Sequence, residues 1–389
     1  MSTTHEWTGD SGLRLNNGCA SQESLPHERE ILLHKCPLQH SEVKLQTEEN
    51  GPLRLALAGI SHDHIDILDQ LAPEDFSIVG ACDPDLDFLA AFGSNWDLPP
   101  LKLYGDLGQM LVQTAPDVVA AFGPISDHLA VVRACAPRGI HVMVEKPLAI
   151  SPDHARQMAE LARRYHIHVL TNYETSWYPS TFFAIDKAVE DRAFGPIRKV
   201  LVRDGHGGPV ESGCRAAFLA WLTDPAQSGG GALTDFGCYG ANLMTRLMGG
   251  RHPRSVMAQT HCFKTEIYDV EDDALIVLDY GDAEAVIQAS WNWSFARKDM
   301  EIYGANGFVA ALDKHTVELA TVGSPSRQRV ILPELRKPLQ NPFAYLAAVL
   351  RGSVNLDRID LASIENNLVV TDILAAAQRS AAEGRTIFL

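Results

Sequence analysis

The chain has 389 residues, of which 46% are hydrophobic and 21% charged, an ordinary globular composition with room for two domains. Its 33 Lys and Arg against 49 Asp and Glu give a net charge of −16, which repels phosphate backbones and acidic membrane surfaces. No apolar run approaches the roughly 18 residues that cross a bilayer. We therefore expect neither nucleic acid nor a membrane as a partner.

The cysteines are seven in number, dispersed along the chain, and form no C-x-x-C pair. Reduced thiols in a cytoplasmic protein explain this pattern better than a disulfide or zinc framework. The start of the chain lacks the basic and apolar regions of a signal peptide, so none is expected. Residues 1–50 are polar and contain few clustered apolar side chains, which predicts a flexible N-terminal arm.

A regular alternation of strands and helices begins at Leu53. Apolar runs bounded by Gly or Asp predict strands, and the stretches between them have helical spacing. The predicted strands are 53–58, 76–82, 118–122, 141–144 and 166–171, and the predicted helices include 65–71, 125–136 and 152–165. This rhythm predicts an α/β fold with a doubly wound parallel sheet, a Rossmann domain over residues 51–172.

The turn after the first predicted strand reads Gly59-Ile60-Ser61-His62-Asp63-His64, where a dinucleotide fold expects G-x-G-x-x-G. Only the first glycine is present. Asp83 ends the second strand, where a carboxylate binds both ribose hydroxyls and repels a 2′-phosphate, so NAD is favoured over NADP. The alternative is a generic α/β turn with a capping Asp.

Three histidines near this turn, His62, His64 and His128, raise the question of a metal. Alternate residues on a loop diverge, and no third ligand has a defined spacing, so we expect no metal. His62 is instead expected to donate a hydrogen bond near the pyrophosphate.

Glu145-Lys146-Pro147 follows the predicted strand 141–144. Ligands of open parallel sheets bind beyond the carboxyl ends of the strands, so a lysine there is placed for chemistry. The alternative is a surface Glu-Lys pair before a turn-forming proline.

Residues 232–248 have helical spacing between Gly229-Gly230-Gly231 and Gly249-Gly250. At 100° per residue, one side of this helix carries a polar stripe. Its members are Asp235, Tyr239, Asn242 and Arg246. A solvated helix face would also be polar, but this stripe begins beside glycines that let a ligand approach.

Together these segments resemble the glucose-fructose oxidoreductase, inositol dehydrogenase and MocA family over residues 53–389. Its E-K-P signature matches residues 145–147, and its G-G-x-x-x-D-x-G-x-H/Y signature matches residues 230–239 with Tyr239 in the last place. The segment 123–128, with Pro124 and His128, is similar to the family's P-x-x-x-H turn. The resemblance implies a C-terminal α+β domain over residues 173–389, whose open, mostly antiparallel sheet mediates a homodimer or homotetramer.

The sequence agrees with such a sheet. Its β-rich runs are 197–203, 255–264, 273–280, 284–292 and 299–303. Trp291 and Trp293 alternate onto one face, where they suit a subunit contact or burial against the helices.

The resemblance further implies the residues of an active site for a sugar, glycoside or cyclitol. Catalysis is assigned to Lys146, Asp235 and Tyr239, and we expect the Lys146 ammonium to lower the pKa of Tyr239 so that it accepts the hydroxyl proton. The cofactor-binding residues are Gly59, Ile60, Ser61, His62, Asp83, Pro124, His128, Glu145 and Lys146. Candidate substrate contacts are Tyr173, Trp177, Asp204, His206 and Asn242.

Three other functions remain open at this point. A redox-neutral enzyme of the same family would oxidise a sugar transiently, cleave a glycosidic bond and reduce the product with the same NAD. A sugar or NAD sensor would keep the fold without catalysis, and the altered glycine turn favours it. An unrelated α/β binding module would leave both signature motifs unexplained.

Overall fold

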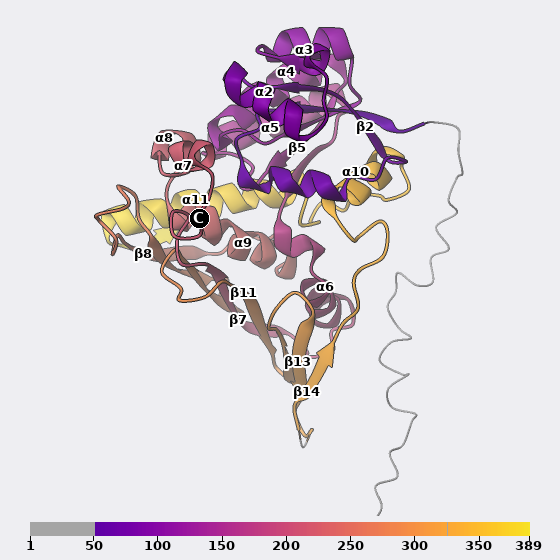
Figure 1. Ribbon diagram of the computed structural model, residues 1–389. Helices are drawn as coiled ribbons and strands as arrows, with labels where there is room; N and C mark the ends of the chain where they lie inside the picture. Colours follow the sequence, from indigo (N-terminus) through magenta and orange to yellow (C-terminus); the bar gives the residue numbers. More distant parts are fainter. Residues whose placement is uncertain (1–50, 325) are drawn as a thin grey trace, which may run out of the picture. The chain divides into compact units, whose positions relative to one another are not determined.

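A computed structural model describes residues 51–389, except residue 325 and the side chain of residue 101. The N-terminal arm expected at residues 1–50 lies outside the described residues. Two β-sheets organise the described part of the chain (Figure 1). None of the helices described there is both long and apolar enough to cross a membrane.

The first sheet is six-stranded and parallel, with the order β3-β2-β1-β4-β5-β6. Its strands are β1 (Leu53–Ala58), β2 (Phe76–Cys82), β3 (Leu103–Tyr104), β4 (Val118–Ala121), β5 (His141–Glu145) and β6 (Val169–Asn172). The predicted doubly wound sheet is confirmed, and the two-residue β3 is an addition too short to leave a pattern. The strand order reverses between β1 and β4, where doubly wound sheets bind ligands.

Helices connect these strands. They are α2 (Leu86–Asn95), α3 (Leu107–Thr114), α4 (His128–Cys135) and α5 (Pro152–Tyr165), with 3-10 turns η2 (Asp63–Gln70), η3 (Pro100–Lys102), η4 (Ile125–Asp127) and η5 (Ala136–Arg138). In α5, the Ser151 hydroxyl accepts from the N–H of His154, Pro152 takes the first position, and His166 ends the helix with a φ of 53°. The prediction for residues 152–165 is therefore confirmed.

The second sheet is nine-stranded, with the order β14-β13-β12-β11-β7-β10-β9-β8-β15. Its strands are β7 (Ile197–Gly205), β8 (Ser255–His261), β9 (Asp273–Asp279), β10 (Glu284–Ser290), β11 (Arg297–Gly304), β12 (Gly307–Ala311), β13 (Thr316–Thr321), β14 (Gln328–Ile331) and β15 (Ile387–Phe388). Only β7 and β10 pair in parallel. The expectation of a mostly antiparallel second sheet is confirmed, and β12 to β15 extend it beyond the five predicted runs.

The remaining helices are η6 (Glu174–Trp177), α6 (Pro179–Ile185), a π-helical turn η7 (Asp186–Glu190), α7 (Ala216–Leu222), α8 (Pro225–Ser228), α9 (Ala232–Leu247), α10 (Pro342–Leu350) and α11 (Ile364–Glu383). Helices α9 and α11 contact each other and pack on the second sheet (Figure 1). Gly240 lets α9 approach closely, since a Cβ there would lie 2.6 Å from the side chain of Ile287. Of its polar stripe only Arg246 is not buried, so the stripe is not a solvated face.

The C-terminal region also packs on the first sheet. Phe343 and Leu346 of α10 belong to the same apolar core as Leu55 of β1 and Phe76 of β2. The backbone N–H of Thr171 in β6 donates to the oxygen of Ala362 at 2.9 Å. Residues 51–172 thus share a core with residues that follow the second sheet.

Candidate active site

Lys146, just beyond β5, and Asp235, in the first turn of α9, form a buried ion pair. The ammonium donates to Oδ1 of Asp235 and, at 3.0 Å, to the backbone oxygen of the same residue. Oδ2 of Asp235 accepts from the indole N–H of Trp291 at 2.9 Å. Burial opposes both charges, but their mutual attraction prevails and lowers the pKa of Asp235 while raising the pKa of Lys146. Both groups are charged at neutral pH.

Tyr239 lies one turn further along α9, between two cations. The Nζ atoms of Lys146 and Lys298 lie 5.3 Å and 5.0 Å from its ring centroid. Its hydroxyl is buried without a hydrogen-bond partner among the described residues. Burial, followed by the charges of Glu174 and Asp204, raises the pKa of Tyr239 well above its ordinary value. The expectation that Lys146 would lower this pKa is wrong, because burial and the nearby carboxylates set the direction of the shift.

A second group of charges faces Tyr239 from the second sheet. Asp204 of β7 and Lys298 of β11 are cross-strand neighbours, but Lys298 binds Glu174 of η6. Asp204 is buried, and its Oδ1 has no hydrogen-bond partner among the described residues. Burial raises the pKa of Asp204 well above its ordinary value. Asp204 is therefore held towards its neutral form. The nearby Glu174 is ionised, because the Lys298 ammonium lowers its pKa against the effect of burial.

The turn after β1 lies at the switch point of the first sheet. Gly59 has a φ of 70°, and a Cβ there would lie 2.6 Å from Gly123 in the turn after β4, next to Pro124. Oδ2 of Asp83 accepts from the N–H of Ile60 at 3.1 Å, so Asp83 stands at the turn as expected.

The backbone donors of this turn are mostly in use. The N–H groups of Gly59, Ile60, His62 and His64 donate to protein acceptors. Those of Ser61 and Asp63 have no partner among the described residues, so two donors at the start of η2 fit a pyrophosphate. The turn therefore fits a dinucleotide with fewer backbone donors than a full glycine motif offers.

Helix α7 covers this turn. The Trp221 indole donates to Oγ of Ser61 at 3.1 Å, and Nε of Arg215 donates to Oδ1 of Asp63 at 2.7 Å. The His62 ring packs on Phe218, with ring centroids 4.6 Å apart. Residues about fifty positions after the end of the first sheet thus cover the turn after β1.

His62, His64 and Glu145 present ligand atoms within 4.8 Å of one another. The fold supplies a third candidate ligand that the sequence did not indicate. However, Nδ1 of His62 accepts from the N–H of His64 at 3.0 Å. The neutral ring therefore carries its proton on Nε2, and this nitrogen is a hydrogen-bond donor. Burial, and then nearby cations, lower the pKa of His62 well below its ordinary value. The absence of a metal stays a prediction, and a fixed neutral donor suits the role expected of His62.

His128 is also buried, and its Nδ1 lies 3.1 Å from the backbone oxygen of Leu148, to which it donates. Its Nε2 is then an acceptor, without a partner among the described residues. Burial lowers the pKa of His128 to about 4. A cofactor donor could satisfy this nitrogen.

The expected substrate contacts fall into two groups. Tyr173 and Asn242 are fully buried and bind protein atoms, the hydroxyl of Tyr173 donating to Asn367 at 2.9 Å and the amide of Asn242 to Leu361 at 2.8 Å. These two side chains join α9 and the end of β6 to α11 and its preceding loop, and their role towards a substrate stays a prediction. Asp204 and His206 remain beside Tyr239 and Phe236.

Trp177 occupies an intermediate position. Its indole donates to Oδ1 of Asn172 at 2.8 Å, and its ring lies 5.4 Å from that of Tyr345. It also lines a small cavity of about 110 Å³. Its role towards a substrate stays a prediction.

Sequence reasoning missed three site residues, Trp291, Lys298 and Glu174. Trp291 was expected at a subunit contact or against the helices, and it is buried with its indole on Asp235. Lys298 would have followed from the β7–β11 register, in which it opposes Asp204. No local signal marks Glu174.

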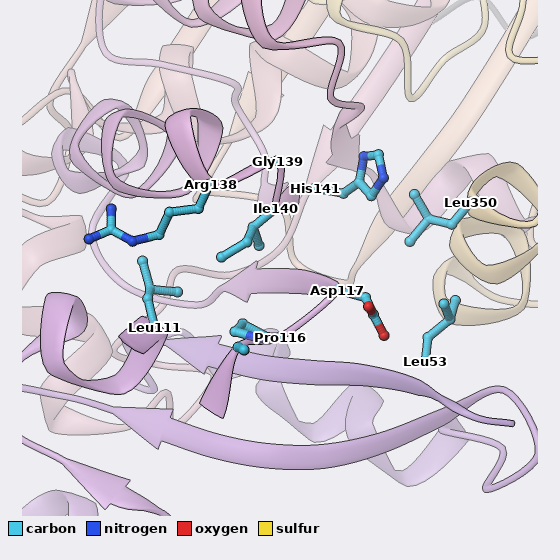
Figure 2. A pocket seen from close by; sticks show the side chains of 10 residues that line it. Leu53, Leu111, Pro116, Asp117, Arg138, Gly139, Ile140, His141 and Leu350 are labelled. Atoms are coloured by element: carbon cyan, nitrogen blue, oxygen red, sulfur yellow. The ribbon is translucent and has the colours of Figure 1, made fainter. Parts of the chain in front are cut away.

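A larger cavity, of about 500 Å³, lies at the opposite edge of the first sheet (Figure 2). Leu53 and His141, at the amino ends of β1 and β5, line it together with Asp117. Asp117 already accepts from the backbone N–H of Arg54 at 2.7 Å. This cavity is remote from the strand ends that carry Asp83 and Lys146.

The fold and site define a Rossmann oxidoreductase with a lysine-carboxylate centre. The family described as oxidoreductase, NAD-binding Rossmann fold, matches residues 55–173, and the GFO/IDH/MocA C-terminal domain matches residues 182–310. The chain belongs to the Gfo/Idh/MocA oxidoreductase family.

Individual proteins are similar to this chain in sequence or in fold. The trans-1,2-dihydrobenzene-1,2-diol dehydrogenase of Xenopus laevis is 27% identical over 252 residues, covering 64% of this chain and 71% of the relative. An inositol dehydrogenase homolog from Azotobacter vinelandii, solved with NAD+, has a TM-score of 0.73 at 19% identity, covering 87% of this chain and 98% of its own. The aldose-aldose oxidoreductase of Caulobacter crescentus, solved with glycerol, has a TM-score of 0.70 at 22% identity, covering 87% and 100%.

Proposed function

We propose that the protein is an NAD-dependent dehydrogenase that oxidises a secondary alcohol of a sugar, glycoside or cyclitol. The observation that carries the proposal is a set of buried polar groups left without partners beside a fixed ammonium. Lys146 has three N–H donors and uses two on Asp235. The hydroxyl of Tyr239 and Oδ1 of Asp204 are unpartnered among the described residues. Buried polar groups normally have partners, so a hydroxylated ligand fits here.

Each residue has a distinct role in this proposal. A bound nicotinamide supplies the hydride acceptor. The third N–H of Lys146 and the neutral hydroxyl of Tyr239 would donate to the substrate oxygen as its O–H bond breaks and the proton passes to water. Asp235 fixes the ammonium, with Trp291 fixing Asp235 in turn. Asp204 binds a neighbouring substrate hydroxyl.

The cofactor preference rests on Asp83. Its carboxylate would accept from the ribose hydroxyls and repel a 2′-phosphate, which favours NAD over NADP. Gly59, Ser61 and His62 would surround the pyrophosphate, and Glu145 and His128 would face the nicotinamide half. Pro124 would border the cofactor from the neighbouring turn.

The test is NADH formation, read by absorbance, with a panel of aldoses, cyclitols and glycosides. Lys146→Met and Tyr239→Phe should each lower turnover by roughly 100-fold or more while NAD still binds. Lys199→Met, which removes an exposed lysine paired with Glu284, is the matched control and should leave turnover unchanged. Wild-type-like rates in both site variants would refute the proposal.

The same panel separates the alternatives. Glycoside cleavage without net NADH would identify the redox-neutral enzyme. NAD binding without turnover on any alcohol would identify the sensor.

We further propose that subunits associate through the uncovered face of the second sheet, as a homodimer or homotetramer in the cytoplasm. Along β9 the buried Ala274, Ile276 and Leu278 alternate with half-buried Leu275 and Val277. An apolar row on the uncovered face suits a subunit contact. Light scattering should show an oligomer that Val277→Lys dissociates, whereas a monomeric wild type would refute the contact.

A further inference from the structure

Lys298 places a second cation in the candidate active site. Its Nζ lies 5.0 Å from the centroid of the Tyr239 ring, and Nζ of Lys146 lies 5.3 Å from the same centroid. The Lys298 side chain is 19% exposed and binds one oxygen of Glu174. An ammonium has three N–H donors, so Lys298 keeps donors without an acceptor among the described residues. Two ammonium groups with a free donor therefore border one aromatic ring.

His206, which follows β7, adds a neutral donor to the site. Its ring centroid lies 5.0 Å from that of Phe236, and Nζ of Lys146 lies 5.4 Å from the Phe236 centroid. Nδ1 of His206 accepts from the N–H of Gly208 at 2.9 Å. Burial lowers the pKa of His206, so the neutral ring carries its proton on Nε2. That N–H has no acceptor within the described part of the chain and is available to a ligand.

The ionised carboxylates of the site already bind donors of the protein. One oxygen of Asp235 binds an ammonium and the other binds an indole. One oxygen of Glu174 binds Lys298, and the other accepts from the hydroxyl of Tyr178. Asp204 differs, since it is buried and its Oδ1 has no partner among the described residues. The hydrogen bonds that the site leaves open are therefore mostly those of donors.

A surplus of donors favours a ligand group that only accepts hydrogen bonds. A sugar hydroxyl brings a donor of its own, and Asp204 is the carboxyl left to accept from it. A carboxylate brings acceptors alone and forms strong, charge-assisted hydrogen bonds with an ammonium. With Asp204 held towards its neutral form, the two lysine–carboxylate pairs leave no net negative charge to repel an anion.

We propose that the substrate is a sugar acid whose carboxylate binds Lys298 and His206, an inference that rests on the proposed dehydrogenase function. Its carbinol lies against Lys146 and Tyr239. The carbinol C–H bond breaks and its electron pair passes as hydride to NAD+. The O–H bond breaks, its electrons form the second C–O bond, the proton passes to water, and a keto acid results. The carboxylate takes no part in bond breaking, and its hydrogen bonds hold the carbinol in place.

The test compares sugars that differ only in a carboxylate. The pairs are galacturonate and galactose, glucuronate and glucose, and gluconate and glucitol, each assayed with NAD by NADH formation. For the acid that is oxidised best, kcat/KM should exceed that of its neutral partner by roughly 100-fold or more, because a site built to bind a polar group rejects the analogue that lacks it. Galactose 6-phosphate and glucose 6-phosphate test whether any anion suffices.

Lys298→Met is the diagnostic variant, because Glu174 is 45% exposed and water can replace the lost ammonium there. KM for the acid should rise by roughly 30-fold or more, while kcat/KM for the neutral partner stays within about threefold. A merely structural role would affect both substrates alike. Lys298→Arg keeps the charge and should recover part of the preference for the acid. Lys199→Met, which removes an exposed lysine, is the control.

A binding measurement does not depend on turnover. With NADH bound, the enzyme has no hydride acceptor, so calorimetry gives the dissociation constants of the acid and of its neutral partner. The acid should bind roughly 30-fold more tightly or better, and Lys298→Met should remove this difference. Added salt should weaken the binding of the acid more than that of the neutral sugar.

The outcomes separate this inference from the function on which it rests. Neutral sugars oxidised as efficiently as their acids, or an acid preference unchanged in Lys298→Met, overturn the inference and leave the dehydrogenase intact. A preference for the sugar phosphates over the acids overturns it equally. Preferred binding of an acid without NADH formation from any alcohol refutes the dehydrogenase and supports the carboxylate site. Neither binding preference nor turnover in the whole panel refutes both.

Discussion

Removing one charge of the Lys146–Asp235 pair should destabilise the protein far more than removing both. The two side chains are 5% and 7% exposed, so little water can replace a missing partner. Lys146→Met keeps the apolar stem but leaves the Asp235 carboxylate with the Trp291 indole as its remaining side-chain donor. Breaking a buried pair in this way costs about 3–5 kcal/mol, a large part of the roughly 5–15 kcal/mol that holds a domain folded.

The double variant Lys146→Met/Asp235→Asn tests the reasoning. It removes both charges of the pair, and the Asn oxygen can still accept from Trp291. We expect its free energy of unfolding to lie within about 1–2 kcal/mol of the wild type, because a buried pair repays little more than its own desolvation. Urea unfolding followed by tryptophan fluorescence measures the double variant and both single variants, Lys146→Met and Asp235→Asn. Costs that add in the double variant to within about 0.5 kcal/mol would refute the coupling.

The pair also predicts a pH dependence. The lowered pKa of Asp235 gives stability that is present above the unfolded-state pKa and is lost as pH falls through the folded-state pKa. The raised pKa of Lys146 gives stability that is present below its unfolded-state pKa and is lost as pH rises through the folded-state pKa. The full contribution therefore spans about pH 4 to about pH 10. Lys146→Met should instead recover stability on acidification, as Asp235 takes up a proton.

Three further predictions follow from single contacts. Tyr239→Phe removes an unpartnered hydroxyl, so it should raise the melting temperature of the cofactor-free protein even as turnover falls. The rise should correspond to about 1 kcal/mol of stability. A lower melting temperature would show that the hydroxyl has a partner. Gly59→Ala places a Cβ against Gly123 at a φ of 70°. It should lower the free energy of unfolding by roughly 1–3 kcal/mol, measured by urea unfolding. An unchanged unfolding midpoint would contradict this prediction. Asp83→Asn should increase the ratio of NADP affinity to NAD affinity on the order of tenfold, or about 1.4 kcal/mol. Fluorescence titrations with the two cofactors measure this ratio. An unchanged ratio would show that Asp83 does not select the cofactor.

The sequence predicted what local patterns carry. Apart from the two-residue β3, the parallel strands were readable because each is a buried, mostly apolar run. Helix α9 was readable from its spacing and its flanking glycines. The proximity of Lys146 and Asp235 followed from two signature motifs, although the residues are far apart along the chain.

What the sequence did not predict depends on burial and on long-range register. Tyr239 was expected to be acidic because a lysine was near, but the sign of its pKa shift is set by burial and by Glu174 and Asp204. The pairing of His64 with Glu145 depends on how η2 meets the end of β5, and no local pattern indicates that these two residues pair. β12 to β14 are short strands on one edge of a sheet, where alternation is weakest.

The contacts of α7 with the turn after β1 bear on how long a cofactor stays bound. Trp221, Arg215 and Phe218 fasten α7 to Ser61, Asp63 and His62, the residues that would surround the pyrophosphate. We propose that these contacts open before a dinucleotide held there departs, so that the motion of α7 would govern its residence time. An enzyme with slow cofactor exchange can oxidise one substrate and reduce the next with the same molecule of cofactor. The Trp221 indole lies at that point, so the fluorescence difference between the wild type and Trp221→Phe would follow the exchange.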